Sequence, residues 1–193
     1  MVCADPLFRQ GWYRYAGHRP SPHCDARPEG MRVDLLVLHN ISLPAGEFGS
    51  ACVDALFLGI LDTQTRPEFA ALQGLRVSSH FFIRRDGGLL QYVSCDQRAW
   101  HAGASSFQGR SRCNDFSIGI ELEGTDSLPF EPAQYDSLAA VVGALLQVYP
   151  IQSLAGHSDI APGRKTDPGP CFDWSALRRA SALGMSSFPG LEA

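Results

Sequence analysis

The segment 33–38, VDLLVL, restricts the fold of this chain more than any other feature. Its side chains are apolar almost throughout and mostly branched. Such a run is typical of a strand that is buried on both faces of a sheet. The run leads directly into His39, so the sequence places an imidazole at the end of a buried strand, where open α/β sheets present functional groups.

Three further stretches predict strands. Residues 77–84 and 89–93 are joined by an Asp-Gly step at 86–87, which is a hairpin signal. Residues 117–123, SIGIELE, alternate in character, so their side chains point to opposite faces in turn. One face carries Ile118, Ile120 and Leu122, and the other carries Gly119, Glu121 and Glu123.

Helices are predicted between and after these strands. Residues 51–61 favour a short helix, and residues 133–148 favour an amphipathic helix that packs on a sheet. Pro132 suits the first turn of the second helix, and Asp173 is expected to cap a last helix over 174–183. The chain is therefore expected to be a single α/β domain, with a mixed sheet of about four to six strands flanked by helices.

Composition limits the classes of partner. The 193 residues carry a net charge of −4, which argues against a broad basic surface for nucleic acid or anionic membrane. No window approaches the length of a membrane span, and residues 1–15 lack the pattern of a secretory signal. We therefore expect a cytoplasmic protein with no obligate protein partner. Its six cysteines are irregularly spaced, which favours reduced thiols.

The stretch 156–170, GHSDIAPGRKTDPGP, is rich in glycine and proline and has no apolar run. Proline removes backbone donors and glycine is costly to order, so we expect neither a helix nor a central strand here. A loop of this length is either disordered or held in place by some other group. It carries His157, Lys165 and Asp167, which makes these side chains candidates for a functional site.

His39, His157 and Asp167 together suggest a metal site. Two imidazoles and one carboxylate make a three-ligand zinc site with a fourth position open, a pattern typical of catalytic zinc. A bound metal would also hold the loop in place. The spacing alone does not decide the ligands, because no H-E-x-x-H motif is present and Cys171 is a rival ligand four residues after Asp167.

Two kinds of side chain could assist such a metal. Glu121 lies opposite the isoleucines of its strand, so it could accept a proton from water if that face lines a groove. Glu123 lies on the same face and has the same claim. Lys165 could place a positive charge against a developing oxyanion.

The other four histidines point less clearly to chemistry. His101 follows Trp100 in a loop of small residues, RAWHAGAS, of the kind that lines a ligand groove. Each of the four, taken alone, is expected to be structural or merely polar rather than a metal ligand: His18, His23, His80 and His101.

Six stretches of the chain carry a resemblance to a known family. They are RPSPHCDARP (19–28), LLVLHNISLPAGEFG (35–49), LRVSSHFFIRRDGGLLQYV (75–93), RAWHAGAS (98–105), RCNDFSIGIELEGTD (112–126) and GHSDIAPGRKTDPGPCFDW (156–174). The chain resembles the zinc amidases that cleave N-acetylmuramyl-L-alanine bonds, and among them the cytosolic 1,6-anhydro-N-acetylmuramyl-L-alanine amidases.

The resemblance implies a domain plan. It implies an amidase and peptidoglycan-recognition fold with zinc in a groove on one face of the sheet. The zinc amidase core is expected over 32–170. Residues 1–31 are expected to be an irregular segment packed on this core, and 184–193 a loose tail.

The resemblance also assigns roles to the candidate residues. It implies that zinc is bound by His39, His157 and Asp167, so Cys171 is not a ligand. It implies that Glu121 rather than Glu123 is the proton acceptor. Lys165 falls on the family's transition-state stabiliser.

The implied substrate is a muropeptide, cleaved between the lactyl group of the anhydro-muramyl sugar and L-alanine during recycling of wall fragments. Accumulated fragments signal β-lactamase induction in some bacteria. Arg76 and Arg112 are candidates for binding the carboxylates of the stem peptide, and Asn40 and Trp100 for polar and stacking contacts. Two alternatives are a muropeptide-binding module without catalysis and a secreted wall-lytic amidase.

Overall fold

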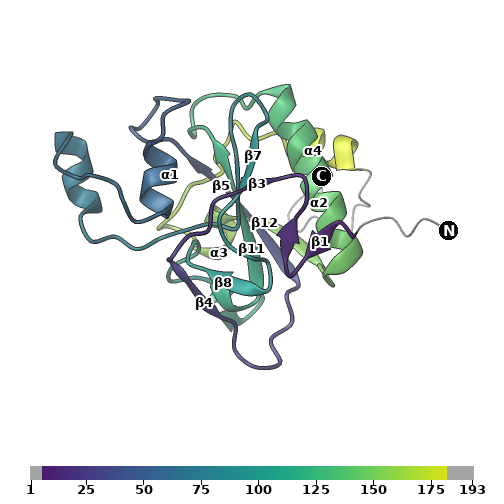
Figure 1. Cartoon of the computed structure of the whole chain (residues 1–193). Helices are drawn as coiled ribbons and strands as arrows, with labels where there is room; N and C mark the ends of the chain where they lie inside the picture. The colour runs from purple at the N-terminus through teal and green to yellow at the C-terminus, as the bar shows by residue number, and fades with distance from the viewer. Residues whose placement is uncertain (1–5, 182–193) are drawn as a thin grey trace.

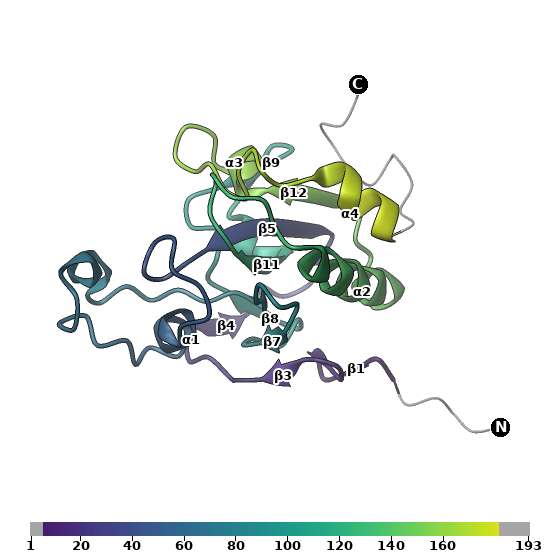
Figure 2. The ribbon, with the colours of Figure 1, turned by 90° about the horizontal axis from the view of Figure 1, so that it is seen from above.

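A computed structural model describes residues 6–181 of the chain. Its centre is a six-stranded mixed sheet (Figure 1) in the order β12-β5-β11-β6-β7-β3, and Figure 2 shows β12 at one side and β3 at the other. The strands are β12 (Ser153–Gly156), β5 (Leu35–Ile41), β11 (Ser117–Glu123), β6 (Phe81–Ile83), β7 (Leu89–Gln91) and β3 (Gly17–His18). The first four are parallel, β6 and β7 form an antiparallel hairpin, and β3 is parallel to β7.

Shorter elements surround this sheet. Three antiparallel pairs lie outside it: β1 (Phe8–Arg9) with β2 (Trp12–Tyr13), β4 (Cys24–Ala26) with β8 (Gln97–Ala99), and β9 (Ser106–Phe107) with β10 (Arg110–Ser111). The helices are α1 (Cys52–Phe57), η1 (Pro67–Leu72), η2 (Cys113–Asp115), α2 (Pro132–Val148), α3 (His157–Ile160) and α4 (Trp174–Ser181). No helix among the described residues is both long and apolar enough to cross a membrane.

Helices α2 and α4 cover one face of the sheet, and α1 lies on the other side (Figure 1). The amphipathic helix predicted over 133–148 is confirmed as α2, and it begins with Pro132. The cluster at this face joins the sheet to the helices: Leu36, Leu38, Ile118, Ile120 and Leu122 with Leu138, Val141, Val142, Leu145 and Leu177. The apolar face predicted for 117–123 is therefore the face that packs on α2.

On the opposite face of the sheet lie the alternate side chains of the same strands. Leu35 and Val37 pack there with residues near α3 and η2, and a second cluster lies under α1. Because side chains alternate along a strand, His39 follows Leu35 and Val37 onto this face. The parallel register places Glu121 beside His39. The sheet thus brings an imidazole and a carboxylate together on the face away from α2.

The structure corrects the prediction for residues 156–170 and shortens two predicted elements. The stretch 156–170 was expected to have no helix, but α3 is a single helical turn at its start. The prolines begin only at 162, and Asp159 Oδ2 accepts the backbone N–H of Gly156 at 2.7 Å, which stabilises the turn. The strand expected over 77–84 pairs only as β6, and the helix expected over 51–61 is limited to α1.

The two ends of the chain differ in what the structure shows. Residues 1–31 were expected to be irregular, but the described part contains β1 to β4, and β3 completes the sheet. Gln91 ties this segment down, because it accepts the N–H of Tyr13 at 2.7 Å and donates to the backbone oxygen of Gly11 at 2.8 Å. At the other end, Asp173 caps α4 by accepting the N–H of Ala176 at 2.9 Å, as predicted. The expected tail, 184–193, lies outside the described residues.

Replacement of Asp54 by alanine is expected to destabilise the fold by about 3–5 kcal/mol, because loss of one partner leaves buried polar groups uncompensated. Asp54 is 3% exposed on α1 and bonds Arg19, Arg84 and the hydroxyl of Tyr92. Unfolding in urea measures the effect. Asp86, an exposed carboxylate in the β6–β7 turn, is the control position, and equal losses for the two alanine variants would contradict the role given to Asp54.

Candidate metal and catalytic site

Three side chains from separate parts of the chain converge at one edge of the sheet. His39 lies on β5, His157 is the first residue of α3 directly after β12, and Asp167 lies in the following loop. Because β12 and β5 are parallel neighbours, their carboxyl ends meet at the same edge. The Nδ1 atoms of the two imidazoles are 2.9 Å apart. Oδ2 of Asp167 lies 3.1 Å from Nδ1 of His39 and 3.0 Å from Nδ1 of His157.

This donor set fits a divalent metal ion. Zinc bonds of about 2.0–2.1 Å place tetrahedral ligands about 3.3–3.4 Å apart, close to the spacing of these three atoms. The set also leaves one tetrahedral position for water or substrate. Among the described residues, one group could hold a metal: His39, His157 and Asp167, whose ligand atoms lie within 4.8 Å of one another. Cys171 is not part of this group.

The electrostatics of the group favour the protonation states that a metal requires. Burial lowers the pKa of His39 to about 4, so its ring is neutral at pH 7. Burial raises the pKa of Asp167, but hydrogen bonds with His157 and His39 outweigh burial and hold that pKa well below its ordinary value. A neutral imidazole and an ionised carboxylate are the forms that bind metal ions.

The loop that carries Asp167 is held by hydrogen bonds. Asn40 Nδ2 donates to the backbone oxygen of Pro168 at 3.0 Å and to Asp126 Oδ1 at 2.7 Å. The backbone N–H of Ser158 donates to the backbone oxygen of Asp167 at 2.9 Å. Asn40, which the sequence suggested as a substrate contact, therefore also fixes the position of the loop.

Glu121 and Glu123 share a face of β11 but have different surroundings. Glu121 is 8% exposed and lines the cavity that contains the metal group. Its Oε2 atom is buried with no hydrogen-bond partner among the described residues. Both oxygens of Glu123 accept backbone N–H groups, from Gly49 at 2.6 Å and from Arg85 at 3.0 Å. These contacts favour Glu121 as a reactive carboxylate and Glu123 as a structural one.

The pKa of Glu121 suits proton transfer. Burial and the charge of Asp167 raise this pKa well above its ordinary value, while Lys165 acts in the opposite direction. A raised pKa makes the ionised carboxylate a stronger base, which suits a group that accepts a proton. Lys165 lines the same cavity, so its ammonium group can act on the same bound molecule.

The metal group lies where two hollows meet. One hollow has a volume of about 240 Å³ and is lined by the three members of the metal group and by Glu121. Its apolar wall is formed by Leu56, Phe57, Leu72, Leu75 and Val77. The other, of about 390 Å³, shares Asn40, Ile41, Lys165 and Asp167 with the first and adds polar side chains such as Asp126, Arg164 and Thr166. A ligand that spans both would pass over the metal group.

Trp100, which was predicted to make a stacking contact, lines the apolar hollow. Its Nε1–H donates to Asp25 Oδ1 at 3.2 Å, and its ring stacks on that of His23 with the centroids 6.0 Å apart. The indole is therefore fixed in place, which suits a side chain that binds a ring by stacking.

The two predicted arginines have different surroundings. Arg76 lines a hollow of about 200 Å³ that shares Leu56, Leu72 and Leu75 with the apolar one. Arg112 lies before η2 in a left-handed backbone conformation, with φ at 62°, and its Nε atom is 3.3 Å from Asp115 Oδ2. Its side chain is 69% exposed. The structure thus brings Arg76 close to the groove and gives Arg112 an acidic neighbour.

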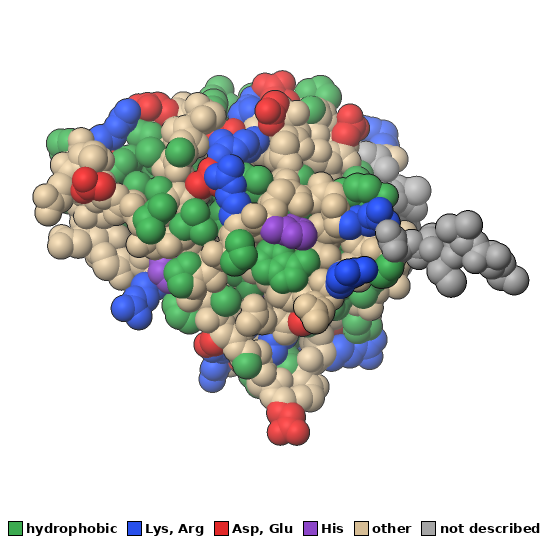
Figure 3. Space-filling view, in the orientation of Figure 1, with side chains coloured by type: hydrophobic (Ala, Val, Ile, Leu, Met, Phe, Trp, Pro, Cys, Tyr) green, Lys and Arg blue, Asp and Glu red, His purple; other side chains and the backbone are tan. Residues whose placement is uncertain are grey.

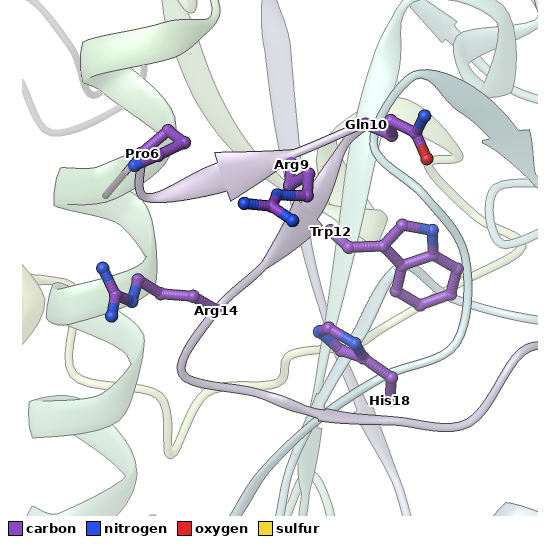
Figure 4. A pocket seen from close by; sticks show the side chains of 6 residues that line it. All are labelled: Pro6, Arg9, Gln10, Trp12, Arg14 and His18. Atoms are coloured by element: carbon purple, nitrogen blue, oxygen red, sulfur yellow. The ribbon is translucent and has the colours of Figure 1, made fainter.

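Cavity size alone does not identify this site. A larger cavity, of about 470 Å³, is formed by the N-terminal segment (Figure 4), with Arg9, Trp12, Arg14 and His18 in its lining. None of the metal group lines it. On the face shown in Figure 3, acidic and basic side chains are interspersed rather than separated by sign.

Two residues at the site were not predicted to take part in its chemistry. His101 lies 2.9 Å from His39 through their ring nitrogens, and Arg164 donates to the backbone oxygen of Ala102 at 2.8 Å. The sequence did contain one signal for His101. Gly119 lies inside a predicted strand, where a glycine often marks the close approach of another group.

The comparison with known proteins decides the family. Residues 29–170 match the family model described as N-acetylmuramoyl-L-alanine amidase, which is more than half of the chain. The chain belongs to the N-acetylmuramoyl-L-alanine amidase family. This amidase is 59% identical over 174 residues to the 1,6-anhydro-N-acetylmuramyl-L-alanine amidase AmpD of Escherichia coli (strain K12), across 89% of this chain and 95% of that protein.

Solved structures agree. The crystal structure of a selenomethionine AmpD derivative matches this amidase with a TM-score of 0.88 at 58% identity, covering 90% of this chain and 98% of that one. The amidase AmiD from E. coli, in complex with the substrate anhydro-N-acetylmuramic acid-L-Ala-D-gamma-Glu-L-Lys, matches with a TM-score of 0.58 at 31% identity, covering 82% and 61%. The predicted fold class and the predicted amidase activity are confirmed.

Proposed function

We propose that this amidase uses zinc to hydrolyse the amide bond between the lactyl group of 1,6-anhydro-N-acetylmuramic acid and L-alanine of the stem peptide. The observation that carries the zinc assignment is the convergence of two Nδ1 atoms and one carboxylate oxygen, 2.9–3.1 Å apart, at the junction of two hollows. His39, His157 and Asp167 would hold the ion. Zinc bound there supplies a Lewis acid that polarises a carbonyl and lowers the pKa of water.

In the proposed mechanism Glu121 moves the proton. Its unpartnered oxygen lies in the cavity, so it can accept a proton from the attacking water and later pass that proton to the leaving alanine nitrogen. Burial of the carboxyl keeps bulk water from competing for this proton.

Lys165 is proposed to stabilise the oxyanion that forms on the lactyl carbonyl. It lines both hollows, so its ammonium group can reach the scissile bond of a ligand that spans them. The loop 156–170 therefore contributes two of the three proposed ligands and the cation, which explains why it is ordered without being mostly regular structure.

We propose that Asn40, Trp100, Arg76 and Arg112 contact the substrate, with the arginines binding stem carboxylates. A fixed indole beside apolar side chains suits a sugar ring. The name of the E. coli relative and the substrate in the AmiD complex support an anhydro-muropeptide as the ligand.

We also propose the setting and the extent of the catalytic unit. The enzyme would act in the cytoplasm on recycled wall fragments, without an obligate protein partner, and residues 32–170 would form the amidase core of a single domain. Where such fragments act as signals, its activity would also lower β-lactamase induction. Comparison of activity on intact sacculi and on soluble fragments tests the setting, because a wall-lytic enzyme would release peptide from sacculi.

The amidase is expected to prefer anhydro-muropeptides to stems on a reducing muramyl sugar. A bicyclic anhydro ring is rigid, so a pocket fitted to it loses little entropy on binding. The measurement is a competition at equal concentrations of the two muramyl tripeptides, with release of each free peptide followed over time. Similar kcat/KM values for the two substrates would contradict the preference and would leave the amidase activity in place.

A further inference from the structure

The ring nitrogen of His39 that points away from the metal group has a partner. Nδ1 of His39 faces His157 and Asp167, whereas its Nε2 lies 2.9 Å from Nδ1 of His101. The other nitrogen of His101, Nε2, lies 3.1 Å from Oγ of Ser117, which is buried on β11. The ligand ring is thus the first member of a hydrogen-bonded line of two imidazoles and a hydroxyl.

This line determines where the protons lie. If Nδ1 of His39 offers its lone pair to a metal, the ring proton is on Nε2 and is donated to Nδ1 of His101. His101 then accepts at Nδ1, carries its own proton on Nε2 and donates it to Ser117.

The sheet makes room for the His101 ring. A Cβ atom at position 119 would lie 2.5 Å from Cγ of His101, so glycine is required there. The ring is T-shaped against His39, at 5.0 Å between centroids, and against His80, at 5.7 Å. His80 is itself fixed, because its Nδ1 accepts the backbone N–H of Gly119 at 3.0 Å. The position of His101 is therefore set by β11 as well as by its own loop.

The residues 101–102 also support the ring of His157. Nε2 of His157 donates to the backbone oxygen of Ala102 at 3.1 Å. Asn114 holds these two residues in place, because its Oδ1 accepts the backbone N–H of His101 at 3.2 Å and that of Ala102 at 2.8 Å. Residues 101–102 thus contact the outer nitrogen of both histidines in the group.

We infer that His101 is a positioning residue: it accepts the Nε2 proton of His39 and so fixes the tautomer and orientation that direct Nδ1 to the metal. Partners of this kind orient metal-bound histidines and raise their basicity. The inference rests on the metal site proposed above.

The test compares two substitutions of His101. His101→Leu removes the acceptor, whereas His101→Asn places an amide oxygen near the position of the Nδ1 atom. In competition with a chromophoric chelator, His101→Leu is expected to bind zinc about 10–100-fold more weakly than the wild type, and His101→Asn to recover most of this loss. Gly119→Ala, which displaces the ring, is expected to weaken zinc binding in the same direction.

His23→Leu is the matched control. His23 is also buried, at 8% exposure, and its Nδ1 bonds the backbone oxygen of Val77 at 3.0 Å, but it does not belong to the metal group. Its loss is expected to lower thermal stability and to leave zinc affinity unchanged. A purely structural role for His101 would make His101→Leu behave in the same way, and that result would overturn the inference.

A spectroscopic readout tests the proton positions directly. In the zinc-loaded wild type, long-range ¹H–¹⁵N NMR should show the proton of His101 on Nε2, and a proton on Nδ1 would overturn the inference. If the wild type binds zinc and His101→Leu binds it equally well, this inference fails and the proposed function stands. A wild type that binds no zinc would overturn both.

Discussion

Replacement of Glu121 by glutamine is expected to lower kcat by about 100-fold or more, the scale of a lost general base. Glutamine keeps the shape of the side chain but does not accept the proton of the attacking water. Zinc content should not change, because Glu121 is not a member of the metal group. Thermal stability should be kept or raised, since the substitution removes a buried carboxylate whose Oε2 has no partner. Steady-state kinetics, metal analysis and thermal unfolding measure the three quantities.

Glu123→Gln is the matched control and is expected to show the opposite pattern. Each oxygen of Glu123 accepts a backbone N–H, from Gly49 or Arg85, and a glutamine amide would present N–H groups to one of these donors. A lost bond to a buried partner destabilises a fold by about 1–3 kcal/mol. The variant should unfold at a lower temperature and keep most of its kcat. If the two glutamine variants behave alike, the assignment of Glu121 is wrong.

Replacement of Asp167 by alanine is expected to remove both the metal and the activity. The carboxylate is the only anionic member of the group, and its loss leaves the two imidazoles without a negatively charged co-ligand. Loss of a residue that only hydrogen-bonds a ligand lowers metal affinity by about 10–100-fold. Loss of Asp167 should lower zinc affinity by more than this. Metal content measured after dialysis, together with amidase activity at saturating substrate, tests this expectation.

Cys171→Ser tests whether the cysteine thiol takes part in metal binding. Cys171 is four residues beyond Asp167 in the sequence but lies outside the metal group. This variant should therefore keep both zinc and activity. Treatment of the wild type with a chelator should abolish activity, and added zinc should restore it. Full activity in a metal-free preparation would contradict the proposed metal chemistry, whatever the variants show.

Much of the sheet could be predicted because its signals are local. The apolar run that precedes His39 and the alternation of SIGIELE both gave the correct strands, and the helical spacing after Pro132 gave α2. Periodicity works here because burial imposes a repeat of two or of about 3.6 residues on the chain. The alternation of side chains along a strand also places Glu121 and His39 on one face, once the pairing of their strands is known.

Short elements could not be predicted in the same way. β12 and α3 each span four residues, which is too few for a periodic pattern. The glycine and proline content of the stretch 156–170 argued against any helix, but the first four residues after Gly156 precede the prolines. The turn forms because Asp159 caps it, a contact between side chain and backbone that composition does not reveal.

The sequence by itself determined which chemical groups are available: two imidazoles, a carboxylate and a lysine in the motifs of an amidase. Only the tertiary structure brings His39 to Asp167, across 128 positions of the chain, and separates Glu121 from Glu123 by their partners. It also revealed His101 behind His39. The physical reason is that hydrogen bonds between distant segments depend on how strands are ordered in the sheet, and local patterns of hydrophobicity specify the strands but not their neighbours.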